Sequence, residues 1–127
     1  MNSVTVVDYG IVNLRNIVRG LEHVGAKVET TDDPDRVLKS NRLILPGVGA
    51  FEVGMSKLGL RGLDRALIEV VNLGRPVLGI CLGMQMLLNY STENGRNQGL
   101  GLIPGRVEPI PKKNHYNGAK RRKVPHI

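Results

Sequence analysis

Short apolar runs rich in β-branched residues alternate in this chain with stretches whose apolar residues recur at helical spacing, and this alternation limits the possible folds most strongly. The apolar runs predict strands at residues 4–7, 28–30, 43–45 and 77–80. Strands that alternate with helices form βαβ units, whose strands lie parallel. We therefore expect an α/β fold with an open, mainly parallel sheet and flanking helices.

Helices are predicted where apolar residues form a stripe between residues that start or stop a helix. The predicted helices contain, in chain order, Leu14 to Val24, Val37 and Leu38, Met55 and Leu58, Leu63 to Val71, and residues 84–90. Asp32-Asp33-Pro34 supplies a cap and a proline at the start of the second of them. Residues 91–105, rich in Gly and Asn, are predicted to form a loop, and residues 106–109 and 124–127 are predicted as two further strands.

Composition restricts the class of protein. A chain of 127 residues with 41% hydrophobic content is suited to one globular domain with a packed core. Its single cysteine excludes an internal disulfide and cysteine-rich zinc sites, and we expect neither a metal nor another cofactor. The sequence lacks the ~20 consecutive apolar residues of a membrane span and the pattern of a signal peptide, so the expected compartment is the cytoplasm.

The net charge of +7 comes almost entirely from one segment. Residues 1–108 carry 12 basic and 11 acidic residues, whereas residues 112–123 hold the other six lysines and arginines. We expect this segment to be a solvated basic hairpin or loop, because Asn114, Asn117 and Gly118 are typical of a turn. Attraction of phosphate or RNA is the weaker alternative, since a basic run with one aromatic residue indicates nucleic-acid binding only poorly.

The only cysteine, Cys81, directly follows the predicted strand 77–80. Gly79 and Gly83 flank it and let the backbone bend sharply without Cβ clashes, as in the nucleophile elbow of serine hydrolases. The thiol would lie at a helix N-terminus, where free N–H groups favour a thiolate and the Leu82 N–H can stabilise an oxyanion. The alternative is a small buried hydrophobe, but two glycines only weaken a core strand. The pattern favours a nucleophile.

A glycine-rich loop is expected beside this cysteine. Loops that follow neighbouring parallel strands meet at one edge of a sheet. By this rule, three loops should lie together: residues 8–10, 46–51 and 81–83. Val48 or Gly49 could then supply a second backbone donor for the oxyanion. A plain strand-to-helix turn is the alternative for this loop.

These segments resemble the class I (triad) glutamine amidotransferases, and most closely the glutaminase subunits of imidazole glycerol phosphate synthase. The matching segments are residues 7–10, 13–14, 45–51, 79–85, 99–105 and 124–126. The resemblance implies a flavodoxin-like fold and a reaction in which Cys81 attacks the side-chain amide of L-glutamine, leaving a glutamyl thioester that water hydrolyses. The ammonia would pass to a TIM-barrel synthase (cyclase) subunit, the protein partner, which forms imidazole glycerol phosphate and AICAR in histidine biosynthesis.

The resemblance also implies how the oxyanion is held. The backbone N–H groups of Leu82 and Val48 match the family's donors, and the Val48 peptide must reorient before the hole is complete. Gly49 belongs to the same loop. Gly47 matches a position beside the substrate.

Other residues match the substrate-binding and partner-binding positions of the family. Gln85 and Glu93 match positions that hold glutamine, where the Glu93 carboxylate would pair with the α-ammonium group. Asn13 and His126 match the side that meets the synthase subunit. One departure lies there, because Val12 stands where family members commonly have Gly, and a β-branched residue narrows the conformations of that loop.

The family's catalytic His and Glu belong to a part that would follow residue 127, and His23 and His115 are predicted far from Cys81. We therefore expect residues 1–127 to be the N-terminal part of one glutaminase domain, C-terminally incomplete and with little glutaminase activity alone. Two alternatives remain. The chain could be a paralogous subunit that feeds a sugar amidotransferase in surface-polysaccharide synthesis, or a non-catalytic interaction domain with the same fold.

Overall fold

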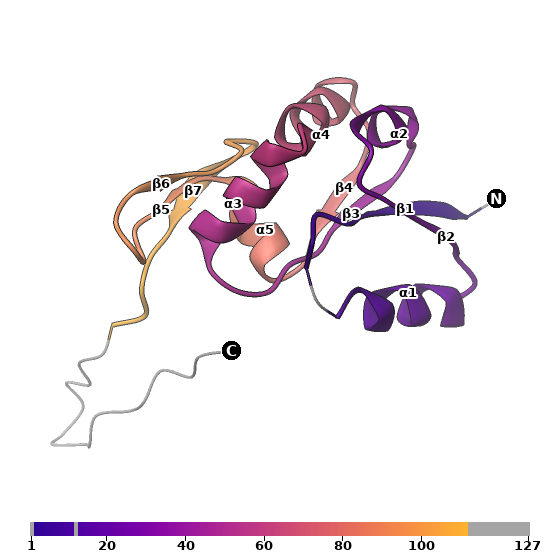
Figure 1. The fold of residues 1–127 in the computed structure, drawn as a ribbon, viewed down its shortest axis with the longest axis horizontal. Helices are drawn as coiled ribbons and strands as arrows, with labels where there is room; N and C mark the ends of the chain where they lie inside the picture. Colours follow the sequence, from indigo (N-terminus) through magenta and orange to yellow (C-terminus); the bar gives the residue numbers. More distant parts are fainter. Residues whose placement is uncertain (1, 12, 112–127) are drawn as a thin grey trace, which may run out of the picture.

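The computed structural model describes residues 2–11 and 13–111 of the chain, and its larger sheet has four parallel strands in the order β2-β1-β3-β4 (Figure 1). These strands are β1 (Ser3–Val7), β2 (Lys27–Thr31), β3 (Leu43–Leu45) and β4 (Val77–Gly79). Each matches a predicted apolar run to within one residue at either end. The expected parallel α/β sheet is confirmed.

Helices cover both faces of this sheet. They are α1 (Leu14–His23), α2 (Pro34–Lys39), α3 (Phe51–Leu60), α4 (Leu63–Asn72) and α5 (Leu82–Met86). Helix α1 lies on one face, and α2 and α4 lie on the other, where they pack together (Figure 1). The predicted cap of α2 is present, because the Asp33 carboxylate accepts the Asp35 N–H at 2.9 Å. In the described residues no helix is long and apolar enough to cross a membrane.

The core lies mainly between the sheet and the layer formed by α2, α3 and α4. Strand β3 is apolar throughout and buried on both faces, as its sequence predicted. The opposite face is covered unevenly. Ile44 on β3 is 5% exposed, whereas its register partner Leu78 on β4 is 57% exposed. Within the described residues, α1 covers the sheet near β2 and leaves the face of β4 open to solvent.

The helix predicted over residues 84–90 is wrong beyond Met86. Helix α5 ends at Met86, and β5 (Leu88–Ser91) begins two residues later. The cause is pairing with a distant segment: the Leu100 N–H donates to the Met86 carbonyl, and the Leu102 N–H donates to the Leu87 carbonyl, both at 2.8 Å. These long-range hydrogen bonds override the local helical pattern of the apolar run.

The loop predicted over residues 91–105 is wrong in part. It contains β6 (Asn97–Gln98) and the start of β7 (Ile103–Val107), which join β5 in a second sheet of order β6-β5-β7. Strand β7 holds Pro104 and Gly105, which ordinarily argue against a strand, and it lies at the sheet edge with a register shift. Of the strand predicted over residues 106–109, residues 106 and 107 are therefore the end of β7, and residues 108 and 109 lie outside it. The predictions for Val12, residues 112–123 and residues 124–127 lie outside the described residues.

Candidate functional site

Cys81 forms the bend between β4 and α5. Its backbone has φ 54° and ψ −120°, a conformation that non-glycine residues rarely adopt. Such a residue persists only where its surroundings hold it, and positions of this kind concentrate at functional sites. The thiol is free and exposed. The chain therefore presents its only sulfhydryl group to solvent on a strained turn.

The flanking glycines are required by close approach of the backbone. A Cβ on Gly83 would lie 1.8 Å from the carbonyl oxygen of Leu45, and one on Gly79 would lie 2.6 Å from the Cα of Met84. Neither glycine has a positive φ. Cys81 itself has the positive φ, and the glycines let β3 and α5 approach the turn closely enough to hold it there.

The glycine-rich loop after β3 lies against this turn. A Cβ on Gly47 would lie 2.9 Å from the Cβ of Leu82, and the Gly47 carbonyl accepts the Leu82 N–H at 3.1 Å. The Leu82 N–H, a predicted oxyanion donor, is thus already hydrogen-bonded in this conformation. Beyond Gly47 the loop is open, since Val48 is 40% exposed and Gly49 has φ 104°.

Tyr9 is a site residue that the sequence did not single out. It follows β1, is fully buried, and donates its phenol hydrogen to the carbonyl of Pro46. Its oxygen lies 2.3 Å from where a Cβ on Gly47 would stand. Burial raises the pKa of the Tyr9 phenol above its usual value, so the group remains a hydrogen-bond donor. The only sequence signal for this role is that a large aromatic residue stands in the loop of residues 8–10. That loop is expected beside the loops of residues 46–51 and 81–83.

Gln85 lies one turn along α5 from Cys81. Its backbone N–H donates to the Cys81 carbonyl at 3.1 Å, and its side chain is half-buried. Because Gln85 is on the short helix that starts after Cys81, the amide group is kept near the turn. Its predicted contact with substrate stays a prediction.

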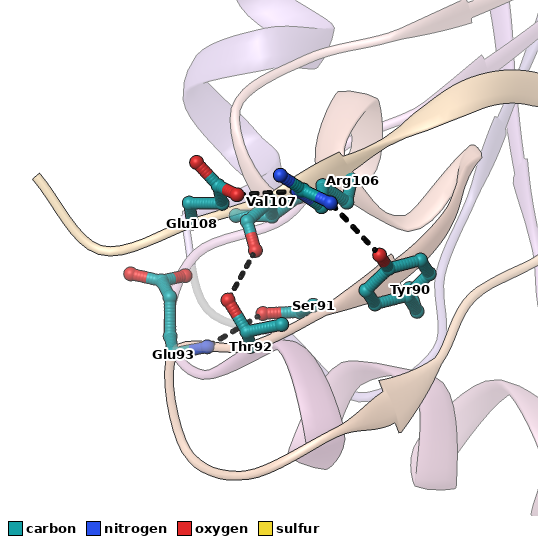
Figure 2. A network of polar contacts seen from close by, with 7 residues as sticks. All are labelled: Tyr90, Ser91, Thr92, Glu93, Arg106, Val107 and Glu108. Carbon is teal, nitrogen blue, oxygen red and sulfur yellow. Dashed lines mark hydrogen bonds and ion pairs between the residues drawn. The ribbon is translucent and has the colours of Figure 1, made fainter.

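Glu93 lies on the turn that follows β5 (Figure 2). Its N–H donates to the Ser91 hydroxyl at 3.3 Å, while its carboxylate extends from the turn and takes no part in the contacts that join Tyr90, Arg106 and Glu108. The next residue, Asn94, donates to the carboxylate of Glu52 at 3.1 Å. Since Glu52 is in the first turn of α3, this hydrogen bond connects the Glu93 turn to the helix that follows the glycine-rich loop.

The predicted partner-binding residues are only partly described. Asn13 is exposed at the start of α1, with φ 71°. It follows the carboxyl end of β1, as Cys81 follows the carboxyl end of the parallel strand β4. His126 lies outside the described residues. His23 is the last residue of α1, at the opposite end of that helix from Asn13. The part of the chain that the structure describes therefore offers no histidine beside Cys81, and it holds no cluster of three or more His, Cys, Asp or Glu suited to a metal ion.

Comparisons with known proteins show the family of this chain. The family model described as glutamine amidotransferase class-I matches residues 5–126. Imidazole glycerol phosphate synthase subunit HisH 1 of Legionella pneumophila (strain Lens) is 42% identical over 127 residues, which are all of this chain and 59% of that protein. Subunit HisH of Symbiobacterium thermophilum is 49% identical over 111 residues, 87% of this chain and 52% of that protein. The chain thus spans about three fifths or less of the length of these relatives.

Solved structures share the fold. A structure described as a glutamine amidotransferase matches with a TM-score of 0.71 and 19% identity, covering 82% of this chain and 55% of that one. A peptidase E protein from Listeria monocytogenes EGD-e matches with a TM-score of 0.65 and 16% identity, covering 80% and 63%. At such identities the likeness concerns the fold alone, and it confirms the predicted flavodoxin-like α/β class.

Proposed function

The chain belongs to the class-I glutamine amidotransferase family, and we propose that it is the part of a glutaminase subunit that carries the nucleophile. In this proposal Cys81 releases ammonia from L-glutamine, and a TIM-barrel synthase subunit uses the ammonia to form imidazole glycerol phosphate and AICAR in histidine biosynthesis. The observation that carries the proposal is the exposed thiol of Cys81 on a turn with φ 54°, directly against a glycine-rich loop.

The chemistry is nucleophilic acyl transfer. The Cys81 sulfur attacks the carbonyl carbon of the glutamine side chain and forms a tetrahedral intermediate whose oxygen carries a negative charge. When this intermediate collapses, the C–N bond breaks, the nitrogen takes up a proton and leaves as ammonia, and a glutamyl thioester remains. Water then hydrolyses the thioester to glutamate and restores the thiol.

The oxyanion hole requires one peptide to rotate. A trans peptide is planar, so its C=O and N–H point in opposite directions. Because the Gly47 carbonyl points at the Leu82 N–H, the Val48 N–H of the same peptide points away from it. Rotation of the Gly47–Val48 peptide would free the Leu82 N–H and turn the Val48 N–H toward Cys81. We propose that this rotation switches the site on, at a cost of about one hydrogen bond, ~0.5–1.5 kcal/mol.

Substrate binding is assigned to Gly47, Gln85 and Glu93. The carboxylate of Glu93 has no ion-pair partner among the described residues, and it lies on a turn attached to α3 through Asn94, so it is suited to the α-ammonium group of glutamine. The general base and the second carboxylate of the triad are proposed to come from outside the described residues. The chain alone is therefore expected to turn over glutamine slowly or not at all.

The partner follows from the relatives, which are named as subunits of imidazole glycerol phosphate synthase. Exposed Asn13, on the same sheet edge as Cys81, supports a partner that docks where the ammonia leaves. We propose a heterodimer in which glutaminase (hydrolase) and ammonia-consuming (lyase) steps are divided between two subunits. A free, exposed thiol suits the reducing cytoplasm, which supports the expected compartment.

Co-purification and activity test this proposal. The chain should form a one-to-one complex with the TIM-barrel synthase subunit of the histidine pathway, and binding only to the synthase of a sugar amidotransferase would overturn the assignment of partner. Any glutamate release measured in the complex should disappear in the isosteric variant Cys81→Ser. Release that persists in Cys81→Ser would refute the nucleophile.

A further inference from the structure

Two consecutive carbonyls of the glycine-rich loop are held by different groups. The Pro46 carbonyl accepts the phenol hydrogen of Tyr9, and the Gly47 carbonyl accepts the Leu82 N–H. Pro46, Gly47 and Tyr9 are all buried, whereas Val48 and Gly49 are exposed. The boundary between the fixed and the open part of the loop therefore falls at the Gly47–Val48 peptide.

Tyr9 restrains the loop in two ways. Its hydrogen bond fixes the orientation of the Pro46–Gly47 peptide, and its oxygen stands 2.3 Å from where a Cβ on Gly47 would be, so it also packs against the Gly47 Cα. The ring of Pro46 fixes one further backbone angle. With these three restraints, rotation of the Gly47–Val48 peptide leaves the backbone between β3 and Gly47 in place.

We propose that Tyr9 is a positioning residue that holds the Pro46–Gly47 peptide still while the Gly47–Val48 peptide rotates. The inference rests on the proposed glutaminase function, because its purpose is to bring the Val48 N–H to one defined point beside Cys81. Without the phenol, the whole loop segment moves when the peptide rotates, and the donor reaches that point only part of the time. The buried Pro46 carbonyl would also lose its partner, which loosens the adjacent Leu82–Gly47 hydrogen bond.

The first test needs no variant and no glutamine chemistry. In the wild-type chain, NMR relaxation dispersion should detect microsecond-to-millisecond exchange at the Val48 amide and none at the Gly47 amide. Exchange of equal size at both amides, or at neither, would overturn the claim that the Pro46–Gly47 peptide stays still while the Gly47–Val48 peptide rotates. It would do so even if the chain is a glutaminase.

The second test compares Tyr9→Phe with Tyr90→Phe. The control removes a phenol from β5, where the Tyr90 oxygen accepts a hydrogen bond from the Arg106 guanidinium at 3.3 Å, far from the glycine-rich loop in the sequence. Tyr9→Phe should speed hydrogen exchange of the Leu82 amide about tenfold relative to the Leu67 amide of α4, and Tyr90→Phe should leave that ratio unchanged. An unchanged ratio in folded Tyr9→Phe would refute the role of the phenol.

A chemical readout separates positioning from general damage. Cys81 is the only thiol, so its alkylation can be followed directly. 6-Diazo-5-oxo-L-norleucine places a keto oxygen where the oxyanion would form, whereas iodoacetamide needs no hole. Tyr9→Phe should slow labelling by the diazo-ketone about tenfold and change labelling by iodoacetamide less than about twofold. Equal slowing of both reagents would contradict positioning. Wild-type chain that reacts with iodoacetamide but not with the diazo-ketone would show that no oxyanion hole forms in this chain, and it would refute the positioning role without deciding the proposed function.

Discussion

Replacing Gly83 by alanine should damage the site and the fold together. The new Cβ would lie 1.8 Å from the Leu45 carbonyl oxygen and 2.6 Å from its carbon, and real Cβ atoms essentially never come within 3.0 Å of such atoms. Helix α5 and strand β3 must therefore separate by about 1.2 Å at a contact made of backbone on both sides. Overpacking of this kind costs ~1–3 kcal/mol, and we expect the upper end because no flexible side chain can move aside.

Urea unfolding followed by far-ultraviolet circular dichroism measures this loss. The matched control is Gly20→Ala in α1, where a Cβ would meet no atom within 4 Å and φ is not positive. Alanine favours a helix over glycine, so Gly20→Ala should raise the free energy of unfolding by ~0.5–1 kcal/mol. Gly83→Ala that is as stable as the wild type, or is stabilised like the control, would refute the claim that the elbow depends on this close approach.

Three further predictions concern the cap, the uneven cover of the sheet and the buried phenol. Asp33→Ala should lower the free energy of unfolding by ~1 kcal/mol in the same urea assay, since it removes the acceptor of the Asp35 N–H, whereas Asp33→Asn should lose much less. Ile44→Ala should cost ~2–5 kcal/mol because the side chain is 5% exposed, but Leu78→Ala, at 57% exposure, should cost under ~1 kcal/mol; equal losses would contradict the described packing. The contribution of Tyr9 to the free energy of unfolding should stay level up to a pH of about 10 and fall as the pH rises further, because burial raises the pKa of Tyr9 in the folded chain above its unfolded value, so that unfolding releases a proton there. Urea midpoints at pH 8 and 10.5 should show a smaller fall in Tyr9→Phe, and an identical fall in both proteins would count against the assignment.

The sharp turn at Cys81 could be predicted because its pattern is local. Glycines two residues before and two after Cys81, between an apolar run and a helical stripe, favour a bend between a strand and a helix, and the bend between β4 and α5 confirms it. The meeting of the loops after β1, β3 and β4 could also be predicted, since parallel strands end at one edge. The contacts from Tyr9 to Pro46 and from Leu82 to Gly47 bear this out.

The second sheet could not be predicted from local patterns. Leu87 and Leu88 continue the helical stripe of α5, yet Leu88 begins β5 because residues from Gly99 to Leu102 supply hydrogen bonds to this run. A Cβ on Gly99 would lie 2.2 Å from the Leu88 carbonyl oxygen, so that glycine permits the pairing. A pattern of single residues does not show which distant segment will approach so closely.

The direction of the peptide beside the predicted oxyanion donors could not be predicted from local patterns either. The sequence identifies Leu82 and Val48 as candidate donors, but the direction of the Gly47–Val48 peptide depends on packing between β3, α5 and Tyr9. Tyr9 itself was seen only as part of a turn. Its importance comes from complete burial and from a hydrogen bond to a residue 37 positions away, neither of which a local motif contains.

The central claim is that the strained turn presents the exposed Cys81 thiol, beside the glycine-rich loop, as the nucleophile for glutamine. Mass spectrometry of the chain after incubation with 6-diazo-5-oxo-L-norleucine, with and without excess L-glutamine, tests this claim most directly. The account predicts a single adduct on Cys81 that L-glutamine suppresses and L-asparagine does not. An adduct that L-glutamine fails to suppress, or a folded chain that forms none, would contradict it.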